Sequence, residues 1–559
     1  MAAPPQAERG PVRALALRRA LPALLVAAAV AELLREAWRP GPQLDDAYIS
    51  YRYARNLVEG LGLVYNAGER VEGFTNPLWT LLVAAGLALR LDAPAVGHAL
   101  GLASAAGLLV ATAVYAATGL ARERTLPAAA ATGLVLVSPA FAGWATLGME
   151  TPLFALLATA ALAAHARGRT GWTTALAGLA TLTRPEGALV AAAVYGSDLL
   201  AARRGGRPAL ARALRAPLVY AALLAALTSL RLVYYGAPLP NTFYAKVGGL
   251  PVAGGLYYTQ TFLIEGAWLL LLPAWLGVRH VPALRPGAAF AGLVAAYATG
   301  VGGDVFPHSR FYLPALPALA ALAARGAASA AARDARVGAL AWASLAAAFP
   351  WSLFGLYALR VETCAAILAV ALALAASLES GRPRPGWIAA AALALALRLL
   401  VPMPTDFERL RAGVVPRTRA EALDELRLQN ARLERLALLR SDRLRARAEP
   451  VGLVATGGIG AFGWYSGLPI LDVLGLVDAT IAHSQAPADA DARAWLAAGH
   501  HRSNADYVFS RAPDYLLIPR RGSTGFVAPA TLALWEHPSL ADYEWDPEVV
   551  GYRRRATAR

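Results

Sequence analysis

Residues 95–121 read AVGHALGLASAAGLLVATAVYAATGLA, an apolar run long enough to cross a membrane as a helix. The hydrocarbon core of a bilayer is about 30 Å thick, and a helix needs about 20 apolar residues to span it. Similar runs recur through most of residues 1–402, and 57% of the whole chain is hydrophobic while 16% is charged. We therefore expect an α-helical polytopic membrane protein.

The arginines predict how the chain is threaded through the bilayer. A net charge of +15 would suggest nucleic acid in a soluble protein, but here the arginines cluster in short loops between apolar runs, so no nucleic-acid partner is expected. Cytoplasmic loops hold the excess of basic residues, so the loops at 167–169, 203–207 and 279–285 are placed inside. This rule gives about 13 spans, with a first span at 14–37 and a short interfacial helix at 77–90 kept on the outer side.

Two parts of the chain follow from this threading. The transmembrane part is 1–402, and its first outer loop is 38–94. The part at 403–559 is expected to be an extracytoplasmic domain. Its charged, leucine-punctuated start at 406–447 predicts a helix, and the short β-like runs after 451 predict a small α/β fold. The other outer loops are 141–150, 183–187, 236–258 and 302–310.

Two adjacent carboxylates, Asp45 and Asp46, begin the longest outer loop. Tyr48 and Arg52 follow them at helical spacing. A carboxylate beside arginines stays ionised at neutral pH, so either acid could act as a general base toward a hydroxyl or hold a cation. Asp45 is slightly favoured because it lies nearer the membrane, and simple solvation of a helix end is the alternative.

Polar residues of the outer loops are candidate substrate ligands. Arg184 and Glu186 flank Pro185, which interrupts a helix; a structural ion pair at a kink would also explain them. The other candidates in these loops are Glu72, Asn76, Asn241, Lys246, Asp304, His308 and Arg310. A site for a lipid phosphate needs such groups, because cations clamp the phosphate while a carboxylate activates the attacking hydroxyl. The expected phosphate ligands are Arg52, Arg184, Lys246, His308 and Arg310.

Lys246 is the only lysine among the 52 lysine and arginine residues. An ammonium is a compact point charge, whereas a guanidinium is a planar fork. We interpret this lysine as the partner of a phosphate oxygen, with chance survival in a solvated loop as the alternative.

A glycine pattern in the tail invites a different interpretation. Residues 458–463, GIGAFG, match G-x-G-x-x-G after a β-like run. The following WYSGLP is not expected to open a helix, so we expect these glycines to serve turns, with no dinucleotide bound.

Several motifs together resemble one enzyme class in order and spacing: bacterial GT-C glycosyltransferases that include the terminal β-(1→2) arabinofuranosyltransferase of actinobacterial cell walls. The motifs are DDAYISYRYARNLVEGLGLVYNAGERVEGFTNPLW (45–79), TRPEG (183–187), PLPNTFYAK (238–246), GGDVFPHSRFYLPALP (302–317), GWYSGLPILDVLGLVD (463–478) and HHRSNADYVFSRAPDYLLI (500–518).

The resemblance implies a multi-pass enzyme of the bacterial cytoplasmic (inner) membrane whose active site faces outside. Such an enzyme takes a sugar from a polyprenyl-phosphate donor and passes it to a cell-envelope glycan or another acceptor. The early acidic residue of the class carries over onto Asp45 or Asp46.

The resemblance leaves the sugar, the acceptor, the stereochemistry and a role for a divalent cation open. The alternative functions are a transporter or flippase of a lipid-linked sugar, and an inactive scaffold for wall assembly.

Overall fold

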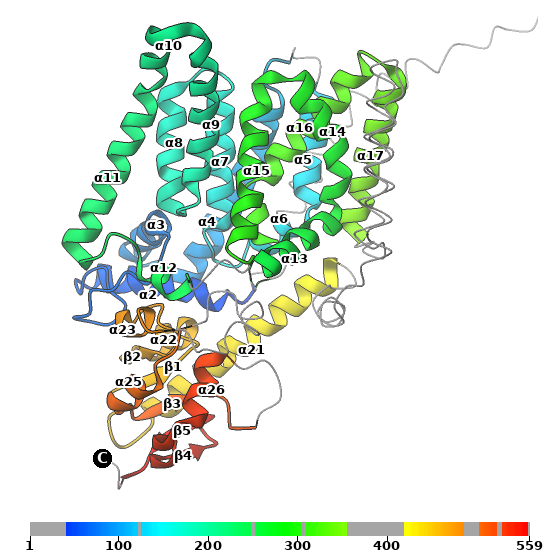
Figure 1. Ribbon diagram of the computed structural model, residues 1–559. Coiled ribbons are helices and arrows are strands. Elements are labelled where there is room, and N and C mark those ends of the chain that lie inside the picture. The colour runs from blue at the N-terminus through cyan, green and yellow to red at the C-terminus, as the bar shows by residue number, and fades with distance from the viewer. Residues whose placement is uncertain are drawn as a thin grey trace, which may run out of the picture.

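A helical bundle stands above a small domain with a five-stranded sheet in the computed structural model of the chain (Figure 1). The structure describes residues 41–120, 125–247, 252–304, 306, 309–354, 419–485, 502–522 and 528–556. The expected first span at 14–37, the expected spans after 355 and His308 lie outside these residues.

Proline marks the start of many bundle helices, because its fixed φ suits the first turn and its missing N–H has no helical partner there. α3, α4, α5, α7, α15 and α16 all carry proline at their first or second position. The bundle and its loops contain α2 (Asp45–Val58), α3 (Pro77–Ala88), α4 (Ala93–Ala116), α5 (Leu126–Val137), α6 (Pro139–Trp144), α7 (Thr151–His165), α8 (Thr170–Thr183), α9 (Gly187–Ala202), α10 (Gly206–Ala213), α11 (Arg215–Tyr235), α12 (Asn241–Lys246), α13 (Val252–Phe262), α14 (Trp268–His280), α15 (Arg285–Gly300), α16 (Leu316–Ala331) and α17 (Ala335–Phe354). Short turns of helix lie between them at η1 (Arg203–Gly205), η2 (Leu263–Ala267), η3 (Pro282–Leu284) and η4 (Arg310–Tyr312).

Fewer helices have the length and composition of a full span than the 13 expected. Among the described residues these are α4 and α11, and a third if α13 and the helix from Glu265 to His280, bent by 47°, form one broken span. The shorter apolar helices, such as α5 and α7, have 12 and 15 residues. At 1.5 Å per residue they are shorter than the hydrocarbon core is thick.

Small residues allow the bundle helices to pack closely, as is common in membranes. α14 and α16 share the most extensive helix contact of the bundle. At Gly326 of α16 an added Cβ would lie 1.9 Å from the carbonyl oxygen of Pro273 in α14, so no larger residue fits.

The two ends of the bundle differ in their chemistry. α2, α3 and α12 lie at the end that faces the C-terminal domain (Figure 1). The break expected at 183–187 is present, because α8 ends at Thr183 and α9 begins at Gly187. The arginine-rich turn of η1 and α10 lies at the opposite end (Figure 1). The arginine-rich turn and the helices α2, α3 and α12 therefore lie at opposite ends of the bundle.

The C-terminal domain combines the expected helix with a mixed sheet. α21 (Arg419–Arg445) leads into β1 (Val454–Thr456), α22 (Gly460–Ser466), β2 (Ile470–Asp472), α23 (Ala479–Ala482), α25 (Ala505–Ser510), β3 (Tyr515–Leu517), α26 (Pro529–Glu536), η6 (Pro538–Asp542), β4 (Tyr543–Asp546) and β5 (Gly551–Arg554). The strand order is β2-β1-β3-β5-β4. β1 pairs in parallel with β2 and β3, whereas β5 is antiparallel to β3 and β4.

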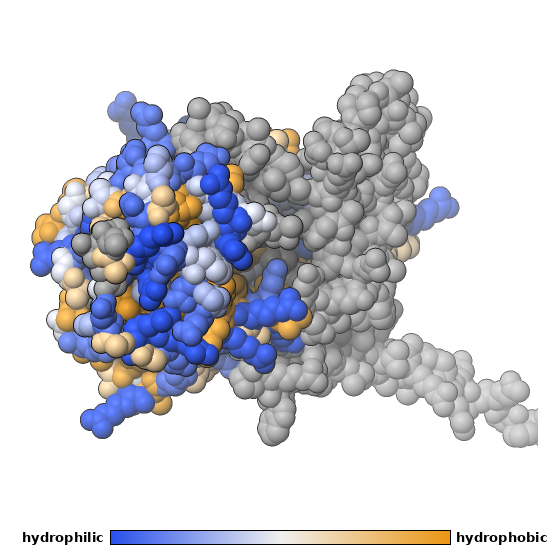
Figure 2. All heavy atoms as spheres, turned by 90° about the horizontal axis from the view of Figure 1, so that it is seen from below, coloured by the Kyte–Doolittle hydropathy of each residue, from blue (hydrophilic) through white to orange (hydrophobic). Residues whose placement is uncertain are grey.

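The sequence prediction for residues 458–463 was wrong in one respect. The short helix α22 does begin there, at Gly460, directly after β1. Seen from below, the domain presents mostly hydrophilic residues with apolar ones scattered between them (Figure 2). That surface suits a domain in water beside the membrane.

The separation of the two ends predicts how the chain sits in the bilayer. In a Cys364→Ser background, single cysteines at the exposed positions Ala67 and Ala541 should react with an impermeant thiol reagent on intact cells. A cysteine at the exposed Gly205 should react only after the cells are opened. Labelling of Gly205 with protection of Ala67 would show that the orientation is inverted.

Candidate active site

Asp45 binds the start of a helix in the C-terminal domain. Its Oδ2 accepts a hydrogen bond from the backbone N–H of Gly460 at 3.1 Å, and its Oδ1 accepts one from Ala461 at 2.8 Å. A Cβ at Gly460 would lie 1.8 Å from the carbonyl oxygen of Asp45, so glycine is required for this approach. Both oxygens of Asp45 therefore have a structural role, and the sequence-based preference for Asp45 as the base loses its support.

The environment of Asp45 changes its acidity. Burial between α2 and α22 raises the pKa of this carboxyl to about 6, and the neighbouring charge of Asp46 adds to the rise. The hydrogen bonds from Ala461 and Gly460 oppose the shift because they stabilise the ionised form.

Arg52 and Tyr48 also join α2 to the C-terminal domain. The guanidinium of Arg52 donates to the carbonyl oxygens of Tyr65, Gly463 and Leu468, each at 2.8 Å. Tyr48 donates to Glu434 of α21 at 2.6 Å. Arg52 was predicted to bind a donor phosphate, but these carbonyls and the Oδ1 of Asn66 already use its N–H groups. Arg52 therefore serves the contact between α2 and the C-terminal domain.

Asp46 differs from its neighbour. Within the part of the chain that the structure describes, its carboxylate makes no hydrogen bond or ion pair. The positive charges that act on it most are Lys246 and then Arg310, and the negative ones are Asp304 and Glu150. Burial is the largest influence and raises the pKa of Asp46 above its ordinary value. Asp46 is thus an uncommitted carboxylate of α2, and the charges that act on it come from α12 and from Glu150, Asp304 and Arg310.

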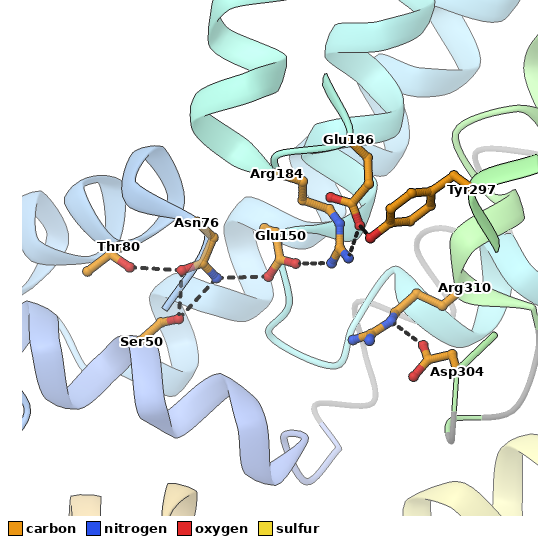
Figure 3. Close-up of polar contacts among 9 residues, drawn as sticks. All are labelled: Ser50, Asn76, Thr80, Glu150, Arg184, Glu186, Tyr297, Asp304 and Arg310. Atoms are coloured by element: carbon orange, nitrogen blue, oxygen red, sulfur yellow. Dashed lines mark hydrogen bonds and ion pairs between the residues drawn. The ribbon is translucent and has the colours of Figure 1, made fainter. Parts of the chain in front are cut away.

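A chain of polar contacts extends from α2 into the bundle (Figure 3). Asn76 contacts Ser50 at 3.1 Å and donates to Glu150 at 2.9 Å. Glu150 forms an ion pair with Arg184 at 2.5 Å, and Arg184 donates to Glu186 at 2.8 Å. The chain ends at Tyr297 of α15, whose hydroxyl donates to Glu186 at 3.0 Å, while Thr80 of α3 donates to Asn76 at 3.1 Å. Two predicted residues, Arg184 and Glu186, are therefore paired, and Asn76 is connected to them.

Arg310 and Asp304 form a second pair beside this chain (Figure 3). Nε of Arg310 lies 2.6 Å from Oδ2 of Asp304, and both side chains are nearly buried. The guanidinium also lies over the rings of Trp144, 5.1 Å from the centroid, and Phe306, 5.0 Å away. These rings and the carboxylate hold the arginine in place.

The other predicted residues have different surroundings. Glu72 forms an ion pair with Arg231 at 2.9 Å. Asn241 donates to the carbonyl oxygens of Gly475 and Leu476 at 2.8 and 3.0 Å, so it anchors α12 to the C-terminal domain. Lys246, at the end of α12, is exposed and makes no ion pair among the described residues.

Two residues of the site were missed by the sequence analysis. Glu150 is buried just before α7 and links Asn76 to Arg184. It is the only charged residue of the outer loop at 141–150, and this isolation could have marked it as a candidate in the sequence. Tyr297 lies in an apolar helix, and no local pattern distinguishes it from a packing residue.

The described residues contain no group of three or more His, Cys, Asp or Glu side chains arranged to hold a metal ion. What the site does bring together is one uncommitted carboxylate, one exposed ammonium and two paired arginines. Such a set can remove a proton from a hydroxyl beside a group that carries negative charge.

The cap on α22 leads to a prediction about the contact between the two parts of the chain. Asp45→Ala should speed amide hydrogen exchange at Gly460–Ser466 about fivefold, because losing a helix cap costs about 1 kcal/mol. Asp45→Asn keeps one acceptor and should have a smaller effect. As a control, Asp92→Ala removes the cap of α4, because the Asp92 side chain accepts a hydrogen bond from the backbone N–H of Ala95. This change should leave hydrogen exchange in α22 unaltered. Unaltered exchange in Asp45→Ala would show that this contact does not hold α22.

Comparison with known proteins adds independent information. Residues 424–555 match a family described only as a domain of unknown function (DUF8728). The chain is 30% identical over 249 residues to the terminal β-(1→2)-arabinofuranosyltransferase of Mycobacterium tuberculosis, covering 40% of this chain and 38% of the relative. The enzyme of the same name from Corynebacterium glutamicum is 34% identical over 323 residues, covering 48% of this chain and 46% of the relative.

The chain thus spans less than half the length of the curated relatives it matches. A crystal structure of ArnT from Cupriavidus metallidurans bound to undecaprenyl phosphate aligns with a TM-score of 0.49 at 17% identity, covering 80% of this chain and 85% of that one. The resemblance noted in the sequence motifs is confirmed by the two sequence matches. The protein is a distant homologue of the terminal β-(1→2)-arabinofuranosyltransferases.

Proposed function

We propose that this membrane protein is a glycosyltransferase that moves a sugar from a polyprenyl-phosphate donor to a cell-envelope glycan or another acceptor on the outer face of the bacterial inner membrane. The observation that carries the proposal is the state of Asp46. It is the site carboxylate without a hydrogen bond or ion pair in the described chain, and the exposed Lys246 is the positive charge that acts on it most. The homology to arabinofuranosyltransferases supports the same reaction class.

Asp46 would act as the general base. Its carboxylate takes the proton of an acceptor hydroxyl while the hydroxyl oxygen attacks the anomeric carbon of the donor. The bond between that carbon and the phosphate oxygen breaks, and its electron pair leaves with the polyprenyl phosphate. Asp46 ends the step protonated, which its raised pKa favours relative to an ordinary aspartate.

Lys246 would bind the departing phosphate. The arginines of the site have carboxylate partners, because Arg184 contacts Glu150 and Glu186 and Arg310 contacts Asp304. Lys246 has no ion-pair partner in the described residues, so its charge is available to a ligand. An ammonium placed where negative charge develops stabilises the transition state more than the ground state.

The set of carboxylates favours a single displacement. A retaining reaction through a covalent intermediate needs a carboxylate nucleophile as well as a base. Asp45, Glu150, Glu186 and Asp304 are held by hydrogen bonds or ion pairs, whereas Asp46 alone of these described acids is not. We therefore propose inversion at the anomeric carbon.

A transporter or flippase of a lipid-linked sugar is the second candidate. Carriers place polar binding groups near the middle of the bilayer. Here α2, which carries Asp46, and α12, which carries Lys246, lie at the end of the bundle that faces the C-terminal domain (Figure 1), which favours an enzyme. Incubating the purified protein with labelled polyprenyl-phosphate sugars and an acceptor distinguishes the two, because only a transferase forms a new glycosidic bond.

Asp46→Asn should lower kcat/KM by about 10²–10⁴-fold, since the amide cannot take a proton. In the unsubstituted protein, kcat/KM should fall as the pH drops through the pKa of Asp46, above the ordinary value of about 3.9, because the base must be ionised. Initial rates across pH measure both effects. Asp45→Asn should keep a larger share of the activity. Normal turnover in Asp46→Asn would reject this carboxylate as the base.

Lys246→Arg should lower kcat/KM about 10-fold or more although it keeps the charge, because the planar fork cannot replace a compact ammonium at a phosphate oxygen. Lys246→Ala should lose more, with KM for the donor raised in both. Arg207→Ala, an exposed cation at the opposite end of the bundle, is the control and should behave like the parent. If Lys246→Arg transfers normally, the phosphate is held by another group.

A further inference from the structure

The short helix α12, which ends in Lys246, is attached to the C-terminal domain. A helix of six residues is too short to be stable alone, so contacts with other parts of the chain decide where it lies. α12 packs against α23 of the C-terminal domain (Figure 1). The position of Lys246 therefore depends on the residues that join α12 to this domain.

Asn241 attaches the first residue of α12. Its Nδ2 donates to the carbonyl oxygens of Gly475 and Leu476 in the C-terminal domain at 2.8 and 3.0 Å. Its backbone N–H donates to the carbonyl oxygen of Glu72, between α2 and α3, at 2.9 Å. The beginning of α12 is thus joined both to the C-terminal domain and to the segment that follows α2.

Arg502 attaches the other end of α12. Its Nε donates to the carbonyl oxygen of Tyr244 at 3.3 Å, and its Nη2 donates to that of Val247 at 2.9 Å. Its Nη1 donates to the carbonyl oxygen of Ser484, just after α23, at 2.6 Å. The last carbonyls of a helix lack partners within it, and an arginine side chain can supply them. One guanidinium therefore holds the backbone on both sides of Lys246.

Two further contacts strengthen this attachment. The ring of Tyr244 stacks on the ring of His483, with centroids 4.5 Å apart and an interplanar angle of 30°. The hydroxyl of Ser484 donates to the carbonyl oxygen of Ser503, the neighbour of Arg502, at 3.0 Å. The end of α23 is therefore joined both to α12 and to the segment that carries Arg502.

The shape of the guanidinium suits this task. Arginine presents five N–H donors in one plane, so it can join acceptors from separate segments, whereas the ammonium of a lysine is a compact point charge. Arg502 bonds three backbone carbonyl oxygens in this way. Three of the sequence motifs meet at this attachment, namely those at 238–246, 463–478 and 500–518.

We infer that Arg502 is a positioning residue, which holds Lys246 in place for the donor phosphate by fixing α12 to the C-terminal domain. The inference rests on the proposed function and adds a task for that domain. The same domain binds α2, the helix of Asp46, through Asp45. It therefore fixes both the helix of the proposed base and the helix of the proposed phosphate ligand.

The lone lysine allows a test that does not depend on sugar transfer. In the full-length protein in lipid nanodiscs, an acylating reagent modifies Lys246 as the only lysine side chain, and mass spectrometry gives its rate. Undecaprenyl phosphate should slow this reaction in the parent. Arg502→Ala should raise the concentration needed for half protection about 5- to 30-fold, as for one or two lost hydrogen bonds. Arg502→Lys should lie between, because its ammonium cannot reach all three carbonyl oxygens.

Kinetics test whether Arg502 acts through Lys246. Arg502→Ala should raise KM for the donor in the parent and cost nothing further in a Lys246→Ala background. Arg440→Ala is the matched control, because Arg440 donates to the carbonyl oxygens of Val549 and Val550 within the C-terminal domain. Its effect should be the same with and without Lys246. If Arg502→Ala does not fold, Arg502→Lys is carried through the same cycle.

The outcomes distinguish this inference from the proposed function. If the parent transfers sugar and Arg502→Ala costs as much without Lys246 as with it, Arg502 only stabilises the domain and the inference is overturned. If the parent transfers no sugar but protection of Lys246 by undecaprenyl phosphate still depends on Arg502, the proposed function fails and the positioning role stands. If undecaprenyl phosphate does not protect Lys246 in the parent, the positioning role is rejected.

Discussion

Two backbone N–H groups on one carboxylate connect the two halves of this protein. The carboxylate of Asp45 in α2 binds the first turn of α22, and Arg52, further along α2, donates to the carbonyl oxygens of Gly463 and Leu468 in and just after α22. The C-terminal domain is therefore fastened to the helix that also carries Asp46. Since adjacent residues of a helix point in different directions, holding Asp45 against α22 leaves Asp46 on another side of α2, where Lys246 is the positive charge that acts on it most.

The partition of positive charge is the second organising feature. Arginine supplies the buried pairs, where its fork can satisfy two carboxylates as Arg184 does with Glu150 and Glu186. These pairs hold the ends of α7, α8 and α9 around the site, and losing one partner would leave an uncompensated buried charge. The lysine at the end of α12 is exposed and has no ion-pair partner among the described residues. On the side of Arg184 the charges of the site are therefore paired with one another, whereas on the side of α12 the charge of the lysine is unpaired among the described residues.

Much of the architecture could be predicted from local sequence. The apolar runs, the break at 183–187, the helix before 447 and the strands after 451 depend on periodicity and on proline and glycine, which act over a few residues. Which helices reach the length of a full span could not be predicted from local sequence, because this depends on where the helices end in three dimensions. The prediction for residues 458–463 failed for a related reason. A helix as short as α22 is stabilised by Asp45, which is 415 residues away from Gly460 in sequence.

By itself, the sequence determined that this chain is built from membrane helices and that acids and bases gather in the loops at one end. It also carried the motifs that relate it to arabinofuranosyltransferases. Only the tertiary structure distinguished Asp45 from Asp46 and the paired arginines from Lys246. The physical reason is that a charged side chain is available for chemistry only if no other group already uses it. The groups that use Asp45, Arg52 and Arg184 come from distant parts of the chain.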